Sequence, residues 1–326
     1  MARNPLTQLP EPDAPSDGMA GGAKQVGHLV RLRGQITAAY GRHYLVELAD
    51  GSVRTCFPKG KKTGAAVGDN VCVVPQGRLE GTIASIEERH SLFYRSDGSR
   101  TKQLAANADQ ILIVVAVEPR FSDDLLGRAL VAASSTGITP LIILNKIDLA
   151  QGLATVRERL RYPTRLGVGV VELSARNAAA TRQRLLPALR GKTSLLLGQS
   201  GMGKSTLINA IIPNARAHTQ EHSQALGAGR HTTTSTRLYR LPDTPGSIID
   251  SPGFQTFGLN HLDAKAIERG FPEFQVEKKH CRFYNCAHQH EPGCGILDAV
   301  RRGDIPTARH ALYLRILAES GVGDRH

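Results

Sequence analysis

Between residues 25 and 90, apolar and polar residues alternate in short runs that are separated by glycine-containing turns. The runs are HLVRLRGQI, HYLVELA, SVRTCF, NVCVV and GTIASI. Alternation with a period of two is typical of half-buried β-strands. Five such strands without a helical stretch predict a small all-β barrel, with an OB-fold as the first choice and an SH3-like barrel as the second.

A different pattern begins near residue 107. The run QILIVVAV is apolar throughout, which is typical of a strand that is buried on both faces. Further apolar runs such as PLIILNK and TSLLLG alternate with helical stretches such as LATVRERLR. This alternation predicts an α/β domain with a parallel sheet over residues 107–262.

The remaining segments differ in composition. Residues 1–24 contain four prolines and little apolar periodicity, so we expect a disordered tail. Residues 91–106 are polar and basic, and we expect a linker. After residue 262 the strand pattern stops, and the stretches GILDAVRRGD and PTARHALYLRILAES predict a mostly helical domain over residues 263–326.

Charge and cysteine content narrow the class of protein. The formal net charge is +12, and residues 24–265 hold 31 basic against 18 acidic side chains. A basic folded surface favours a polyanionic partner such as RNA, although the same charge can serve solubility alone. No run of 18 apolar residues is present, so we expect no membrane association. Five cysteines, an odd number, favour a cytoplasmic protein over a disulfide framework.

The segment GQSGMGKS, residues 198–205, follows a predicted strand and precedes the helical stretch KSTLINAII. It matches the pattern G-x-x-x-x-G-K-[ST] in the context that a phosphate-binding loop requires. Its backbone N–H groups and the following helix start favour phosphate. Lys204 is expected to reach the β- and γ-phosphates, and Ser205 to hold Mg²⁺.

The segment NKID, residues 145–148, follows the apolar run LIIL. Asp148 can accept hydrogen bonds from N1–H and the 2-amino group of guanine together, whereas adenine would leave the carboxylate unpaired. The alkyl stem of Lys146 would lie over the ring, and Asn145 would tie the loop to the base or to the phosphate loop. Taken alone, the same letters also fit a loop with helix-capping residues.

Two further motifs support the nucleotide interpretation. Ser174 and Ala175 begin the segment SAR after the next predicted strand, as the second guanine-side loop does in GTPases. The segment DSPG ends an apolar run; Asp250 would support Mg²⁺ through water, and the N–H of Gly253 would face the γ-phosphate.

The segment GRHTTTST, residues 229–236, lies where a switch loop would supply a hydroxyl to Mg²⁺. The run Thr232–Thr234 leaves three candidates, and we take Thr233 as the ligand. Ras-like enzymes place a water-orienting Gln directly after D-x-x-G, whereas this chain has Phe254. His231 is a candidate replacement, and it could equally contact phosphate or pack in the loop.

The motifs occur in the order base, base, phosphate, switch, Mg²⁺, with the guanine loops before the phosphate loop. A circular permutation explains this order, because the geometry of a site depends on strand ends in space and not on chain order.

A cluster of cysteines and histidines follows in the segment CRFYNCAHQHEPGC. Three thiolates and one imidazole satisfy tetrahedral Zn²⁺ without an open position, which predicts one structural zinc. The thiolates come from Cys281, Cys286 and Cys294, while His280, His288 and His290 compete for the fourth place.

The combination of a barrel, the permuted motifs GQSGMGKS, GRHTTT and DSPGF, and a late Cys/His cluster resembles the RsgA family of small-ribosomal-subunit-dependent GTPases, also called YjeQ or YloQ. The resemblance covers roughly residues 27–320. It implies an OB-fold, a circularly permuted GTPase domain and a zinc domain that dock together on the maturing 30S subunit. It also selects His288 as the fourth zinc ligand and points to His231 as the catalytic replacement for Gln.

We therefore expect a cytoplasmic, monomeric, Mg²⁺-dependent GTPase that acts as a nucleotide switch on the 30S subunit and its 16S rRNA. The expected catalytic residues are His231 and Lys204, and the expected magnesium ligands are Ser205, Asp250 and Thr233. The residues expected to contact GTP are Asn145, Lys146, Asp148, Ser174, Ala175, Gly198, Gln199, Ser200, Gly201, Met202, Gly203, Lys204, Ser205, Thr206 and Gly253. Rival interpretations are an RNA-binding protein that binds GTP without hydrolysing it, and an ATP-dependent P-loop enzyme.

Overall fold

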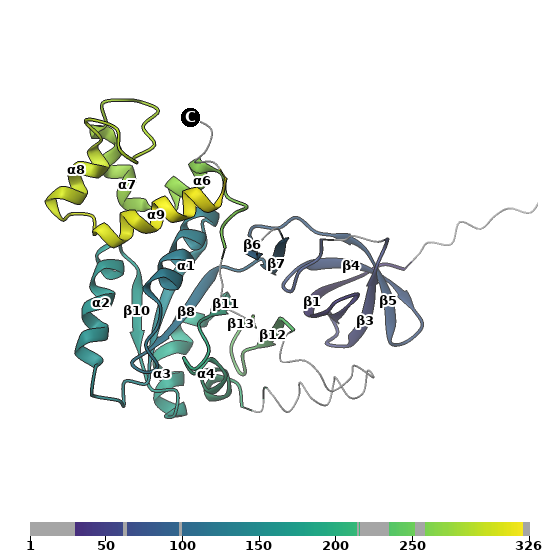
Figure 1. The fold of residues 1–326 in the computed structure, drawn as a ribbon. Coiled ribbons are helices and arrows are strands. Elements are labelled where there is room, and N and C mark those ends of the chain that lie inside the picture. Colours follow the sequence, from purple (N-terminus) through teal and green to yellow (C-terminus); the bar gives the residue numbers. More distant parts are fainter. Residues whose placement is uncertain are drawn as a thin grey trace, which may run out of the picture. The chain divides into compact units, whose positions relative to one another are not determined.

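The computed structural model describes residues 30–60, 64–97, 100–213, 215, 235–251 and 258–321 (Figure 1). The predicted tail, residues 1–24, lies outside these ranges. Among the described residues, no helix is long and apolar enough to cross a membrane.

The first described strands form a closed barrel. They are β1 (Leu32–Tyr40), β2 (His43–Leu48), β3 (Val53–Pro58), β4 (Asn70–Gln76) and β5 (Glu80–Ile86). The hydrogen-bonded order is β1-β2-β3-β5-β4, and β4 pairs back onto β1, so this small sheet has no free edge. Alternate residues face inward, and Ile36, Val46 and Val71 are fully buried. The predicted barrel, with an OB-fold as its first choice, is confirmed.

The segment predicted as a linker contains regular structure that the sequence analysis missed. β6 (Leu92–Asp97) and β7 (Arg100–Ala106) pair as an antiparallel hairpin. Phe93 and Leu104 are buried, so the few apolar residues in this basic segment pack inward. The alternation is short and interrupted by charged residues, which is why it resembled a loop.

The central part is a mostly parallel sheet in the order β10-β9-β8-β11-β13-β12. Its strands are β8 (Gln110–Ala116), β9 (Thr139–Asn145), β10 (Gly169–Glu172), β11 (Thr193–Leu197), β12 (Arg237–Arg240) and β13 (Ser247–Asp250). Only β12 runs antiparallel, against β13. Every residue of β8 is buried, as its unbroken apolar run predicts for a strand covered on both faces.

Four helices accompany this sheet: α1 (Asp123–Thr136), α2 (Leu153–Arg165), α3 (Ala178–Leu189) and α4 (Lys204–Ile211) (Figure 1). Ser122 caps α1 by accepting from the N–H of Leu125, and Asn177 caps α3 by accepting from the N–H of Ala180. The predicted α/β domain is thus confirmed, with each helix following a strand.

The last part is helical: α6 (Ala264–Arg269), α7 (Pro272–Glu277), the short 3₁₀ turn η1 (Lys278–His280), α8 (Gly295–Arg302) and α9 (Thr307–Glu319). Its core contains Phe271, Phe274 and Tyr313, whose ring centroids lie 5.0–5.4 Å apart. Helix α9 lies beside α1 (Figure 1). The predicted domain boundaries at residues 90, 106 and 262 stay predictions.

Candidate functional site

The phosphate loop predicted at residues 198–205 connects β11 to α4. β11 is an inner strand of the sheet, and parallel strands deliver their loops at their carboxyl ends. Gly201 and Gly203 have φ angles of 81° and 89°, a region that favours glycine. Because α4 begins at Lys204, the free N–H groups of its first turn border the loop and favour an anion.

The ammonium group of Lys204 lies over the same loop. Its Nζ donates to the carbonyl of Gly198 and, at 3.0 Å, to the carbonyl of Gln199. Burial lowers the pKa of Lys204, and the nearby carboxylate of Asp250 acts in the opposite direction. Asp250 ends β13 and pairs in register with Leu196 of β11, so a carboxylate stands beside the phosphate loop.

Asn145 connects the phosphate loop to both guanine-side loops. Its side chain is buried, with 2% exposure. Its Nδ2 donates to the carbonyl of Met202 at 2.9 Å. Its Oδ1 accepts from the N–H of Ala175 at 2.9 Å and from the N–H of Lys146 at 2.8 Å. One amide therefore fixes the separation of the three loops that the sequence assigns to GTP.

Asp148 stands at the open end of this arrangement. The side chain of Ser174 lowers the pKa of Asp148, and the charge of Arg176 does so as well. The guanidinium Nη1 of Arg176 lies 3.8 Å from Oδ2 of Asp148. The carboxylate is thus ionised at neutral pH, which is the form that accepts two hydrogen bonds from guanine.

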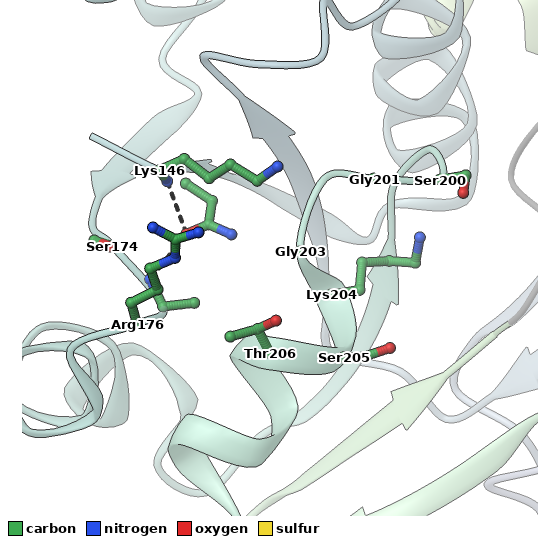
Figure 2. A pocket seen from close by; sticks show the side chains of 11 residues that line it. Lys146, Ser174, Arg176, Ser200, Gly201, Gly203, Lys204, Ser205 and Thr206 are labelled. Atoms are coloured by element: carbon green, nitrogen blue, oxygen red, sulfur yellow. Dashed lines mark hydrogen bonds between the residues drawn. The ribbon is translucent and has the colours of Figure 1, made fainter. Parts of the chain in front are cut away.

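A cavity of about 460 Å³ lies between these loops. It is lined by Asn145, Lys146, Ser174, Ala175, Arg176, Ser200, Gly201, Gly203, Lys204, Ser205 and Thr206. Figure 2 shows Lys146 and Arg176 on one side and the first residues of α4 on the other. A second, adjoining cavity is lined by Asp148 together with Ser174 and Arg176, which places the carboxylate of Asp148 next to the first cavity.

The structure brings most of the predicted nucleotide residues together, with four differences. Gly198 does not line the cavity, and its carbonyl accepts from Lys204. Gln199 does not line it either, since its Oε1 accepts from the N–H of Ser122 at 2.6 Å. Met202 is buried and takes part through its carbonyl. Arg176 lines both cavities, although only the two preceding residues of SAR were expected to contact GTP. His231, Thr233 and Gly253 lie outside the described residues.

The loop that follows β8 was not expected at the site. The carbonyl of Glu118 accepts from Nζ of Lys146 at 2.8 Å, and the N–H of Ser122 donates to Gln199. A Cβ atom on Gly201 would approach Cγ of Pro119 to 3.0 Å. This loop therefore supports both the guanine side and the phosphate side, and its sequence carries no motif that would have revealed it.

The predicted cluster of three cysteines and one histidine is assembled in the middle of the helical part, between η1 and α8. The ligand atoms of Cys281, Cys286, His288 and Cys294 all lie within 4.8 Å of one another. Nδ1 of His288 is 3.6 Å from the sulfur of Cys281 and 3.5 Å from that of Cys294, and these two sulfurs are 4.0 Å apart. Tetrahedral zinc, with bonds of about 2.3 Å to sulfur and 2.0 Å to nitrogen, separates its ligands by roughly 3.5–3.8 Å. The cluster therefore fits zinc.

The surroundings of the cluster favour the same ion. Burial raises the pKa of Cys286 to about 12; a backbone hydrogen bond with His288 acts in the opposite direction, and the neighbouring thiols add to the increase. A bound cation would allow this thiol to ionise at neutral pH. His310 holds the backbone of His288 in place, because its Nε2 donates to the carbonyl of His288 at 2.7 Å. Burial raises the pKa of Glu291, but four backbone hydrogen bonds, from Glu291 itself, Ala287, Gln289 and His290, outweigh it and lower the pKa to about 2.

An ion-pair cluster joins α1 to α9. Arg128 is buried, with 8% of its side chain exposed, and its guanidinium donates to both oxygens of Glu319 at 2.6–2.7 Å. Nε of Arg128 donates to Asp124 at 2.7 Å, and Asp124 also accepts from Arg315 at 2.5 Å. Burial raises the pKa of Asp124, but the hydrogen bonds from Arg128 and Arg315 lower it overall. We call Asp124, Arg128, Arg315 and Glu319 the α1–α9 ion cluster.

The loops that follow β9 and β10, which the sequence predicts to contact guanine, precede the phosphate loop after β11 in the chain. A family model described as RsgA GTPase matches residues 86–260, which is more than half of the chain. The chain belongs to the RsgA GTPase family. It is accordingly a GTP hydrolase with a circularly permuted nucleotide-binding domain.

Curated RsgA relatives match nearly the whole chain. Small ribosomal subunit biogenesis GTPase RsgA from Bordetella pertussis is 62% identical over 292 residues, which cover 90% of this chain and 97% of the relative. The protein of the same name from Paraburkholderia phymatum is 54% identical, covering 89% of this chain and 92% of the relative.

Solved structures of RsgA relatives agree with the fold. YjeQ from Thermotoga maritima superposes with a TM-score of 0.68 at 30% identity, over 91% of this chain and all of that one. YloQ, whose structure is described as a circularly permuted GTPase, gives a TM-score of 0.66 at 26% identity, over 93% of this chain and all of that one.

Proposed function

We propose that this chain is a nucleotide switch in late maturation of the small ribosomal subunit, on which it hydrolyses GTP. The proposal that this chain binds GTP rests mainly on the hydrogen bonds of Asn145, which connect the phosphate loop to both loops expected to contact guanine. The proposal that it acts on the small ribosomal subunit is supported by the name of a relative that is 62% identical, small ribosomal subunit biogenesis GTPase RsgA.

Guanine is selected on one side of the cavity. Asp148 accepts from N1–H and the 2-amino group of the base, and Arg176 together with Ser174 keeps the carboxylate ionised. Lys146 lies against the ring through its alkyl stem, because its ammonium group is held by the carbonyl of Glu118. An adenine base would leave the carboxylate without donors, so ATP is rejected.

Phosphates bind on the other side. The glycines of the loop expose backbone N–H groups, and Lys204 moves from the loop carbonyls to the β- and γ-phosphates when they arrive. Ser205, Asp250 and Thr233 would hold Mg²⁺, which neutralises phosphate charge when bound. The N–H of Gly253 would face the γ-phosphate.

Hydrolysis is slow until a partner completes the site. Phe254 cannot orient a water molecule, so we assign this role to His231. A GTPase without a positioned water turns over at about 10⁻³ s⁻¹ or below, and completion of the site adds several orders of magnitude. We propose that the 30S subunit, through its 16S rRNA, completes the site.

Zinc is proposed as the structural ion of the helical part, bound by Cys281, Cys286, His288 and Cys294. The excess of basic residues in the barrel and GTPase regions supports docking on rRNA phosphates. We further propose that the protein works as a monomer in the cytoplasm.

The test is phosphate release measured alone and with purified 30S, 50S or 70S particles. We expect strong stimulation by 30S that falls steeply with salt, little stimulation by 50S, and loss of the stimulated rate in His231→Ala with GTP binding retained. A fast rate that 30S does not change would contradict the proposal. Binding of GTP and 30S without any hydrolysis would support an RNA-binding protein without enzymatic activity.

A further inference from the structure

The loop between Cys281 and Cys286 presents two aromatic side chains to solvent. Tyr284 is fully exposed, at 103% of its reference area, and Phe283 is 42% exposed. Six large apolar side chains are exposed in the described part of the chain, and three of them lie between Val276 and Tyr284. The exposed apolar surface is therefore concentrated on one short segment of the helical part.

This loop is held in one conformation. Cys281 and Cys286, at its two ends, belong to the zinc cluster. The N–H of Arg282 donates to the carbonyl of Gly293 at 2.9 Å. The N–H of Cys286 donates to the carbonyl of Phe283 at 3.3 Å, which closes a turn with Tyr284 and the following residue at its central positions. The backbone that carries Tyr284 is therefore constrained, and a tyrosine has only two side-chain torsions, so ordering it on binding costs little entropy.

Stability does not explain the tyrosine. Central turn positions favour small polar residues, proline or glycine, and Tyr284 buries no surface there. The aromatic core of the helical part is already filled by Phe271, Phe274 and Tyr313. An exposed aromatic on a rigid support is instead typical of a contact surface.

The positive charges around the loop favour RNA as the partner. Lys279 and Arg282 are exposed, and within the described ranges neither forms an ion pair. By contrast, Lys278 is paired with Glu268. The guanidinium carbon of Arg282 lies 5.5 Å from the centroid of the Phe283 ring. Uncompensated cations beside exposed aromatic rings fit a phosphate backbone with unpaired bases, which stack on such rings.

We propose that the segment Arg282–Asn285 is a stacking platform for unpaired RNA bases, with Tyr284 as its central ring and Lys279 and Arg282 as its phosphate contacts. The inference rests on the proposed function in that the RNA belongs to the small subunit. It adds the place of contact, the chemical state of the RNA and the residues that recognise it.

The chain contains no tryptophan, so Tyr284→Trp introduces a single fluorescent reporter that preserves stacking. The probes are a 12-nucleotide single-stranded oligouridylate, a 12-base-pair RNA duplex and the 30S subunit. We expect the emission of the tryptophan to be quenched by the single strand and by 30S, and to stay unchanged with the duplex.

Tyr284→Ala should bind the oligouridylate and the 30S subunit on the order of tenfold more weakly, because one stacked base is lost. Tyr284→Phe should bind like the original protein. Val276→Ala is the matched control, since it removes an exposed apolar side chain of the same helical part, and it should change nothing. Zinc content and thermal unfolding should be equal in all variants, because Tyr284 buries no surface.

Unchanged affinity in Tyr284→Ala, or unquenched tryptophan on saturating 30S, would overturn the platform. A tryptophan that shifts to shorter wavelength without quenching on 30S would indicate a protein contact and would also overturn it. GTPase stimulation of the unmodified protein, measured in the same samples, separates the two proposals. If 30S stimulates the GTPase activity of the unmodified protein and Tyr284→Ala binds RNA as tightly as that protein, only the platform is rejected. If 30S does not stimulate the unmodified protein, the proposed function is rejected.

Discussion

Replacing Asn145 with alanine should loosen the nucleotide site as a whole. The substitution removes the acceptor for two backbone N–H groups and the donor for one carbonyl. At about 1 kcal/mol for each hydrogen bond, the loss is about 3 kcal/mol. The three loops are then free to separate, and a nucleotide must order them when it binds. If the whole loss appears in binding, affinity for GDP and GTP falls by about 100-fold.

The assay is a titration with a fluorescent GDP analogue, combined with thermal unfolding of the protein with and without nucleotide. Asn107→Ala is the matched control, because Asn107 is also buried and makes two hydrogen bonds, to Gly68 and His90, away from the site. The control should be destabilised and should retain its nucleotide affinity within about twofold. Unchanged affinity and unchanged unfolding in Asn145→Ala would refute the idea that this amide holds the loops together.

The remaining predictions concern the base, the metal and the α1–α9 ion cluster. Asp148→Asn should shift preference from GTP to xanthosine triphosphate, because the amide can donate to the 2-oxygen of xanthine; competition binding tests this, and unchanged GTP affinity would contradict it. Freshly purified protein should hold about one zinc per chain by elemental analysis, and Cys286→Ser should lose it, since structural sites need all four ligands; zinc-free original protein would contradict the assignment. Arg128→Met should lower the free energy of unfolding by about 1–2 kcal/mol, discounted for the half-exposed partners. Because the folded-state pKa of Asp124 lies below its ordinary value of 3.8, this contribution should be complete above that pH and lost as pH falls further. Urea unfolding at several pH values measures it, and an equal effect of the substitution at all pH values would count against the ion pairs.

Much of the fold and of the site was predictable because it is encoded locally. The apolar run of β8, the glycines of the phosphate loop and the spacing of the cysteines each depend on neighbouring residues. Among the three competing histidines, the structure places His288 in the cluster, as the family resemblance implied.

What could not be predicted depends on distant pairs. Arg128 and Glu319 are 191 residues apart, and neither belongs to a motif. Gln199 matches a wildcard position of the phosphate-loop pattern, so its bond to Ser122, 77 residues earlier, left no signal. The exposure of Tyr284 is likewise invisible in the sequence, because a tyrosine between two cysteines of a cluster fits a core position as well as a surface position.

The central place of β8 in the sheet has a consequence for biosynthesis. Of the strands in the central sheet, β8, β9 and β10 are synthesised first and can pair with one another, but the other edge of β8 is paired with β11 in the finished fold. Residues 194–197 of β11 are made 84 positions after their partners 110–113. At about 5–20 residues per second, this apolar edge waits for roughly 4–17 s without its neighbour. An unpaired apolar edge is a template for aggregation, so the nascent chain needs protection between the synthesis of β8 and the synthesis of β11.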